Sequence, residues 1–174
     1  MGAFHHPDPI QYACLKDGIV IIRVNGKGTH LSSPSLRLVF ERTRHGGPAP
    51  RYILDLENCT TMDSTFMGTL ASIGLHQRQQ SGTAAVVTNL NEHVRHLLNT
   101  LGLKYILDMR KDHAVSSRNE QFTSAPAPEP TRLQRILLMI EAHERLVDLD
   151  TENEIKFEGV LNSLRESLRK EHGR

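Results

Sequence analysis

The chain has 174 residues, of which 38% are hydrophobic and 24% are charged. This length accommodates one ordinary domain with an appendage and is ample to bury a core. The formal net charge of +1 gives no electrostatic footprint for nucleic acid or an anionic membrane, and no apolar run approaches the roughly 18 residues of a membrane span. We therefore expect protein partners.

The two cysteines, Cys14 and Cys59, lie far apart in a chain whose start lacks a signal-peptide pattern. This favours a reduced, cytoplasmic protein over a secreted one. Nothing in the neighbouring sequence is arranged to activate a thiolate, so we interpret both cysteines as ordinary core or loop residues.

The first third of the chain predicts a β-hairpin followed by a helix. Residues 12–16 and 19–25 are rich in β-forming side chains and are joined by an Asp-Gly pair, a strong hairpin turn signal. A glycine-containing loop leads to a helix predicted over residues 34–44, with Ser33 as its cap and a proline at its first position.

The next stretch, residues 51–68, reads RYILDLENCTTMDSTFMG. Its apolar start fits a buried strand with Asp55 near the carboxyl end, and the polar residues 58–61 predict a loop. Asp63 can cap a helix that starts at Ser64. The Ser64 hydroxyl would then lie beside free amides and the positive end of a helix dipole, where an anion such as phosphate is favoured.

The following elements alternate. The sequence predicts a helix over residues 64–80, a strand over 83–88, a helix from Asn91 to Gly102, and a last strand over 104–107. An initial hairpin followed by alternating helices and strands implies an α/β domain with right-handed crossovers on a mixed sheet. We assign residues 1–111 to this domain.

The remainder predicts a proline-rich linker, residues 112–130, and a C-terminal α-helical hairpin, residues 131–171. Capping-box patterns at Thr131 and Thr151 open two helices, each with an apolar stripe. A helix pair has little interior, so these stripes must pack on the first domain, on a second copy of the chain, or on another protein.

The motif Asp63-Ser64-Thr65, followed by Phe66 and Met67, resembles the phosphorylatable loop of STAS domains, the anti-sigma-factor antagonist family of bacteria. In that family the loop usually reads Asp-Ser-Ser/Thr-Gly, and the serine after the aspartate accepts phosphate. Ser64 matches the acceptor, whereas Phe66 replaces the usual glycine. The resemblance covers roughly residues 10 to 110, and the segment 142–157 also looks like the tails of some stand-alone STAS proteins.

The resemblance implies a STAS-like mixed sheet and an intracellular interaction protein that is not an enzyme and has no catalytic residue, cofactor or metal. The unmodified form would dock an anti-sigma factor that is also a serine kinase. That kinase would phosphorylate Ser64 with ATP and release the protein, and a PP2C-type phosphatase would reset it. We expect Asp63, Thr65, Phe66 and Met67 at the contact, Phe66 as an apolar anchor, and Thr65 as the second choice of acceptor.

Two other kinds of function remain open. The fold could serve as a scaffold without phosphorylation, self-associating through the C-terminal helices, in which case Ser64 is only a helix-capping serine. A small-ligand sensor is the third possibility, although the sequence offers no convergent polar set for a ligand.

Other sites are disfavoured by what surrounds them. Asp55 could suggest a response-regulator receiver, but the early strands lack the additional acids that hold magnesium, so we interpret Asp55 as a polar anchor at a strand end. Ser64 lacks the Gly-x-Ser-x-Gly elbow of serine hydrolases. His93 and His96 are three apart on a helix but have no evident third metal ligand. The Gly26-x-Gly28 pair lacks the rest of a dinucleotide-binding fingerprint.

Overall fold

The computed structural model describes residues 8–45, 49–110 and 120–173. Within these residues one sheet has six strands in the order β7-β6-β4-β2-β1-β8, and a second sheet has two strands, β3 and β5. The strands are β1 Ile10–Cys14, β2 Ile19–Val24, β3 Gly26–Gly28, β4 Arg51–Asp55, β5 Cys59–Met62, β6 Ala85–Thr88, β7 Leu107–Met109 and β8 Thr123–Ser124. Strand β1 is antiparallel to β2 and β8, and the pairs β2–β4, β4–β6 and β6–β7 are parallel. The predicted mixed α/β sheet is therefore confirmed.

The helices of the first domain pack on the strands through one continuous apolar core. They are α1 Ser33–Thr43, α2 Ser64–Ser81, α3 Glu92–Thr100 and the short 3-10 helix η1 Leu103–Tyr105. Alternate residues of β2, which share one face of the strand, lie in the same buried cluster as Leu36 of α1 and Leu70 of α2. Strand β5 leads directly into α2, so the core fixes the position at which α2 begins.

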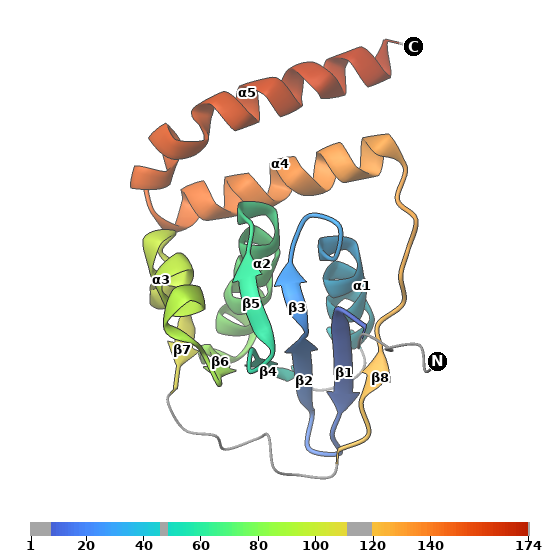
Figure 1. Ribbon diagram of the computed structural model, residues 1–174, viewed down its shortest axis with the longest axis vertical. Coiled ribbons are helices and arrows are strands. Elements are labelled where there is room, and N and C mark those ends of the chain that lie inside the picture. The colour runs from blue at the N-terminus through green and yellow to red at the C-terminus, as the bar shows by residue number, and fades with distance from the viewer. Residues whose placement is uncertain (1–7, 46–48, 111–119, 174) are drawn as a thin grey trace, which may run out of the picture.

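The C-terminal hairpin consists of α4 Arg132–Leu149 and α5 Glu152–His172. Figure 1 shows α4 lying across the end of the domain at which α1 and α2 begin, with α5 on the outer side of α4. Ile136, Ile140 and Leu146 of α4 belong to the main buried cluster. The sequence left open whether the apolar stripes of the hairpin pack on the first domain, on a second copy of the chain or on another protein. The stripe of α4 packs on the first domain.

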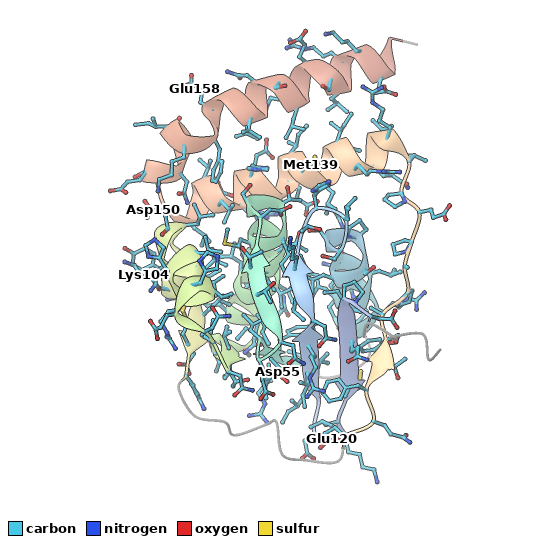
Figure 2. The ribbon with its side chains drawn as sticks, viewed as in Figure 1. Asp55, Lys104, Glu120, Met139, Asp150 and Glu158 are labelled. Carbon is cyan, nitrogen blue, oxygen red and sulfur yellow. The ribbon has the colours of Figure 1, made fainter. Side chains whose placement is uncertain are left out.

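Of the two capping boxes predicted for the hairpin, one is found. Thr131 forms the predicted capping box with Gln134, but Thr151 makes no capping bond with its side chain. Instead the Asp150 carboxylate accepts a bond from the Glu152 amide, 3.0 Å. Asp150 lies at the bend between α4 and α5 (Figure 2), where its Cβ would be 3.0 Å from a Cβ built on Gly102. Because Gly102 also has φ of 80°, this approach of the hairpin to the turn between α3 and η1 favours glycine.

Several predicted boundaries differ. Residues 58–61, expected as a loop, mostly belong to β5, whose pairing with β3 compensates for their polar character. The last strand begins at Leu107 because Leu103–Tyr105 forms a 3-10 turn. Part of the predicted linker, residues 111–119, lies outside the described residues, whereas Thr123–Ser124 pairs with the edge of β1 as β8. Among the described residues, none of the helices combines the length and the apolar composition that crossing a bilayer requires.

Candidate functional site

Asp63 joins the start of α2 to the loop that follows β3. As the N-cap of α2, its Oδ1 accepts a bond from the Phe66 amide at 2.8 Å, as the sequence predicts. Its Oδ2 accepts a second bond, 2.7 Å, from the backbone amide of His30. One carboxylate therefore satisfies a free amide of the helix and fixes a neighbouring loop.

Ser64, the first residue of α2, contacts a residue of the C-terminal hairpin. Its Oγ lies 2.9 Å from Nε2 of His143 on α4. The other ring nitrogen of His143, Nδ1, lies 2.7 Å from the Met139 carbonyl oxygen. A carbonyl oxygen can only accept, so Nδ1 carries a proton and donates to it; in the neutral ring Nε2 then accepts from the Ser64 hydroxyl. The predicted phosphate acceptor is therefore a hydrogen-bond donor to the hairpin.

Helices α2 and α4 come into backbone contact one turn further along α2. A Cβ built on Gly68 would overlap the Ala142 carbonyl group, standing 2.5 Å from its carbon. Real Cβ atoms do not approach other atoms so closely, so only glycine at position 68 permits this crossing. Because Ser64 and Gly68 are four residues apart, they lie on the same face of α2, and Ala142 adjoins His143 on α4.

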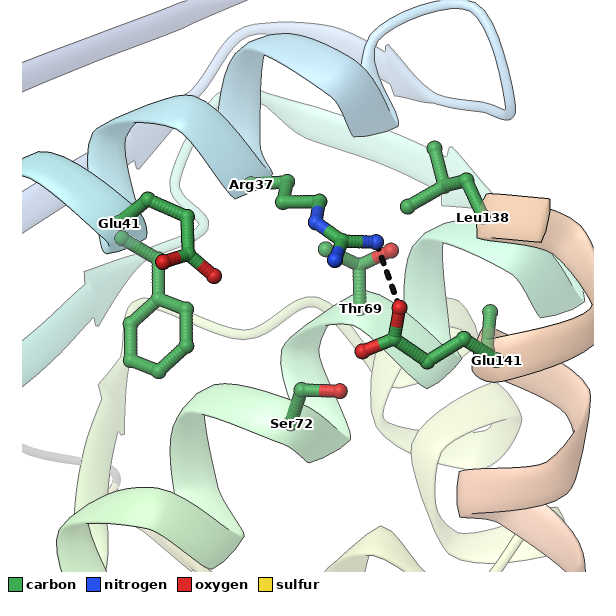
Figure 3. A pocket seen from close by; sticks show the side chains of 8 residues that line it. Arg37, Glu41, Thr69, Ser72, Leu138 and Glu141 are labelled. Atoms are coloured by element: carbon green, nitrogen blue, oxygen red, sulfur yellow. Dashed lines mark hydrogen bonds and ion pairs between the residues drawn. The ribbon is translucent and has the colours of Figure 1, made fainter. Parts of the chain in front are cut away.

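An ion pair joins the hairpin to α1 beside this crossing. The Arg37 guanidinium donates to the Glu141 carboxylate at 2.6 Å (Figure 3). Between α1, α2 and α4 lies a small cavity of about 20 Å³, with Thr69 and Ser72 on the side of α2. A space of this size holds about one water molecule. The junction of the three helices is therefore partly polar and not completely filled.

The predicted partner contacts differ in accessibility. Asp63 is half-buried, whereas Thr65 and Met67 are 5% and 4% exposed, and Phe66 is fully buried. The Phe66 ring packs on Gly28, where an added Cβ would stand 2.6 Å from the ring. In this conformation the buried Phe66 ring supports the loop from inside the domain, and its role as an apolar anchor for a partner stays a prediction. The close approach explains why position 28 is glycine, and this explanation does not require a bound nucleotide.

The remaining candidate residues make contacts within the fold. Asp55 is 1% exposed and binds Arg23 at 2.8 Å and the Asn89 amide at 2.9 Å, which fits its interpretation as a strand-end anchor. Nε2 of His93 lies 3.2 Å from the Thr61 hydroxyl. In the described part of the chain, no three His, Cys, Asp or Glu side chains are grouped to hold a metal ion.

The family of the chain follows from comparison with known proteins. A model of the STAS domain matches residues 14–115. The chain belongs to the STAS domain family. The match covers β2 to β7 and α1 to α3, including the Asp63 cap and Ser64, and ends before β8 and α4. The hairpin that contacts Ser64 is therefore an addition to the STAS domain.

One solved structure shows the same fold, and a second matches more weakly. The structure of the anti-sigma factor antagonist SpoIIAA in its unphosphorylated form is 19% identical, with a TM-score of 0.52 over 60% of this chain and 90% of that chain. The Bacillus cell fate determinant SpoIIAA in its phosphorylated form is 17% identical, with a TM-score of 0.48 over 60% of this chain and 94% of that chain. No curated protein sequence matches.

The sequence predicted Asp63 and Ser64 as site residues but not the α4 residues that contact Ser64 and its neighbours on α1 and α2. Glu141, Ala142 and His143 are consecutive, and each contacts a different residue of α1 or α2. The sequence signal was the segment 142–157, which resembles the tails of some stand-alone STAS proteins but could be linked to no residue-level function. That signal does not identify the surface on which the helix packs.

Proposed function

We propose that this STAS protein is an anti-sigma-factor antagonist controlled by phosphorylation of Ser64. The observation that carries the proposal is the position of the Ser64 hydroxyl, at the first residue of α2 directly after the Asp63 cap. An anion at this position meets the free amides and positive dipole of the helix. The STAS fold supports the general role in protein interaction.

The proposed partner is an anti-sigma factor with serine kinase activity, acting in the bacterial cytoplasm. It binds the unmodified protein at the loop and first turn of α2, formed by Asp63, Thr65, Phe66 and Met67, and transfers the γ-phosphate of ATP to the Ser64 hydroxyl. The product carries an added charge of about −1.5 to −2 at neutral pH, which weakens a desolvated contact with the same partner. A PP2C-type phosphatase hydrolyses the phosphate ester and restores the first state.

The test is intact-mass spectrometry with site mapping on protein isolated from its native cell, before and after phosphatase treatment. We expect a removable phosphate at Ser64, absent from Ser64→Ala and retained in Thr65→Ala. Phosphate that persists in Ser64→Ala and disappears in Thr65→Ala would move the acceptor to the neighbouring residue. Absence of phosphate under every growth condition would contradict the proposal.

A scaffold without phosphorylation is the second candidate, and the bond between Ser64 and His143 favours it. A serine that is hydrogen-bonded to a helix of its own chain has a structural role whether or not a kinase exists. Exposed apolar residues of the hairpin, Leu137, Ile155 and Val160, would then mediate self-association. Light scattering coupled to size exclusion distinguishes the two candidates: a stable oligomer that Ile155→Glu dissociates favours the scaffold, and a monomer contradicts it.

A further inference from the structure

The surface of the STAS domain that carries Ser64 is occupied by a helix of the same chain. We define the Ser64 face as Arg37, Ser64 and Gly68. Each of these residues meets one member of the consecutive triplet 141–143 of α4, through an ion pair, a hydrogen bond and a backbone contact. Figures 1 and 3 show this crossing of α4 over the start of α2 and beside α1.

The contact between Gly68 and Ala142 determines how closely α4 lies over Ser64. Because the two backbones touch there, α4 cannot approach further, and the His143 ring fills the space above the Ser64 hydroxyl at 2.9 Å. A phosphoryl group on Oγ adds a phosphorus atom and three oxygen atoms. A distance of 2.9 Å leaves no room for that group, nor for the γ-phosphate of an incoming nucleotide.

We propose that the hairpin of α4 and α5 is an internal competitor for the Ser64 face. While α4 is docked, neither a partner nor a modifying enzyme reaches Ser64; once Ser64 is modified, α4 no longer docks. The nature of the modification rests on the function proposed above, whereas the competition rests only on the geometry. The hairpin thereby makes access to Ser64 depend on a conformational equilibrium within the chain.

Part of the junction is polar and open to water. The side chains of Arg37 and Glu141 are 41% and 42% exposed, so water weakens their attraction. The neighbouring cavity of about 20 Å³ shows that the three helices do not interlock completely. Phe157 of α5 packs on the His143 ring of α4, with 4.9 Å between ring centres, so α5 can stay with α4 when α4 lifts.

The test uses the full chain with a cysteine in place of Ser64 as a reporter of access. Cys14 is exposed and is replaced by serine, whereas Cys59 is buried and its pKa is raised to about 11, which leaves its thiol protonated and unreactive at pH 7.5. The parent for all measurements is therefore Cys14→Ser with Ser64→Cys. Its rate of alkylation by N-ethylmaleimide is followed by mass spectrometry.

The deciding variant is Gly68→Ala, with Gly159→Ala as its matched control. Both changes replace a helical glycine by the better helix former alanine. At Gly68 the new methyl group collides with Ala142, whereas at Gly159 of α5 nothing lies within 4 Å. We expect Gly68→Ala to accelerate alkylation at position 64 about tenfold or more, and Gly159→Ala to leave it unchanged.

Hydrogen exchange of the same proteins identifies the cause. In Gly68→Ala, α4 should lose protection while strands β4 and β6 keep theirs. Loss of protection in the strands to the same extent would show that the hairpin is an inseparable part of the core, and would overturn the proposal. Alkylation of the parent as fast as an exposed thiol, or no acceleration in a folded Gly68→Ala, would overturn it equally.

A second set of variants decides the question if Gly68→Ala does not fold. Arg37→Glu and Glu141→Arg each place like charges together at the surface of the junction, and the double change restores an opposite pair. Each single change should accelerate alkylation, and the double change should return it to the parent rate; equal rates in all three would refute the competition. Neither measurement involves a kinase, so a protein without phosphate in the cell would refute the proposed function and leave this inference intact.

Discussion

Ser64 and His143 are 79 residues apart in the sequence and share a hydrogen bond of 2.9 Å. The bond links the first turn of the central helix of a STAS domain to a helix outside the matched domain. His143 is only 4% exposed, and its ring also packs edge-on against Phe157 of α5 at 4.9 Å between ring centres. His143 thus connects Ser64 to both helices of the hairpin.

This bond predicts an interaction energy between the two residues. Ser64→Ala leaves Nε2 of His143 buried without its donor, and His143→Ala removes the acceptor together with its packing. A double-mutant cycle should give a coupling of about 1 kcal/mol, measured by urea unfolding. The control cycle pairs His143→Ala with Ser81→Ala at the opposite end of α2, where Ser81 donates to Gln77, and should be additive. A Ser64–His143 coupling no larger than the control value would contradict the hydrogen bond.

The two bonds accepted by Asp63 predict an order of stability among its variants. Asp63→Ala loses the cap of Phe66 and the bond from His30, and should cost about 0.5 to 2 kcal/mol for the cap alone. Asp63→Asn keeps one acceptor oxygen, which can cap α2, but its amide nitrogen cannot accept from His30. We therefore expect thermal unfolding temperatures in the order wild type, Asp63→Asn, Asp63→Ala. Identical values for Asp63→Asn and Asp63→Ala would argue against capping.

The sequence predicted what local chemistry determines. The cap at Asp63, the start of α2 and the order of strands and helices follow from residues close together in the chain, and each is found. The β3–β5 sheet was missed because its residues, mainly glycine, threonine and lysine, do not alternate like a half-buried strand. Its pairing depends on contacts that bring residues 26–28 and 59–62 together across the fold.

The position of the hairpin could not be predicted for a related reason. An apolar stripe shows that a helix has a face to bury, but not against which surface. The surface on which α4 packs depends on the close approach at Gly68. Helix propensity alone counts a glycine inside a helix only as a cost of about 1 kcal/mol. That cost is offset by the contact with Ala142, which lies far away in the sequence.

The contacts of Asn153, at the start of α5, predict a contribution to stability at the bend between α4 and α5. Its side chain is fully buried, and its amide donates to the carbonyl oxygens of Leu101 and Leu146, at 3.1 and 2.7 Å. Asn153→Asp keeps the shape of the side chain but replaces the donating amide nitrogen by an oxygen atom that faces two carbonyl oxygens. This change should cost about 2 kcal/mol or more in unfolding free energy. The matched change Asn162→Asp, on an exposed position of α5, should cost less than about 0.5 kcal/mol. Equal losses in urea unfolding would show that the buried amide contributes nothing specific.

Cys59 predicts a loss of stability at alkaline pH. Burial raises the pKa of its thiol from 9.0 to about 11, because the thiolate would lose its hydration. The unfolded chain therefore releases the proton first as the pH rises above 9, and the folded state loses relative stability until the pH passes about 11. At pH 10 this contribution amounts to about 1.4 kcal/mol relative to pH 7.

The measurement compares unfolding free energies at pH 7 and pH 10. Wild type should lose about 1.4 kcal/mol more between the two values than Cys59→Ala, which lacks the titrating group. The packing cost of Cys59→Ala is the same at both pH values and cancels in this difference, as does the contribution of Tyr52, whose pKa is also raised by burial. Cys14→Ala is the control: the pKa of Cys14 is raised by partial burial, but this residue is exposed, so its removal should reduce the alkaline loss by less. An equal loss in wild type and Cys59→Ala would mean that the folded protein admits a thiolate at position 59, and that the close packing of β5 beneath the start of α2 opens at high pH.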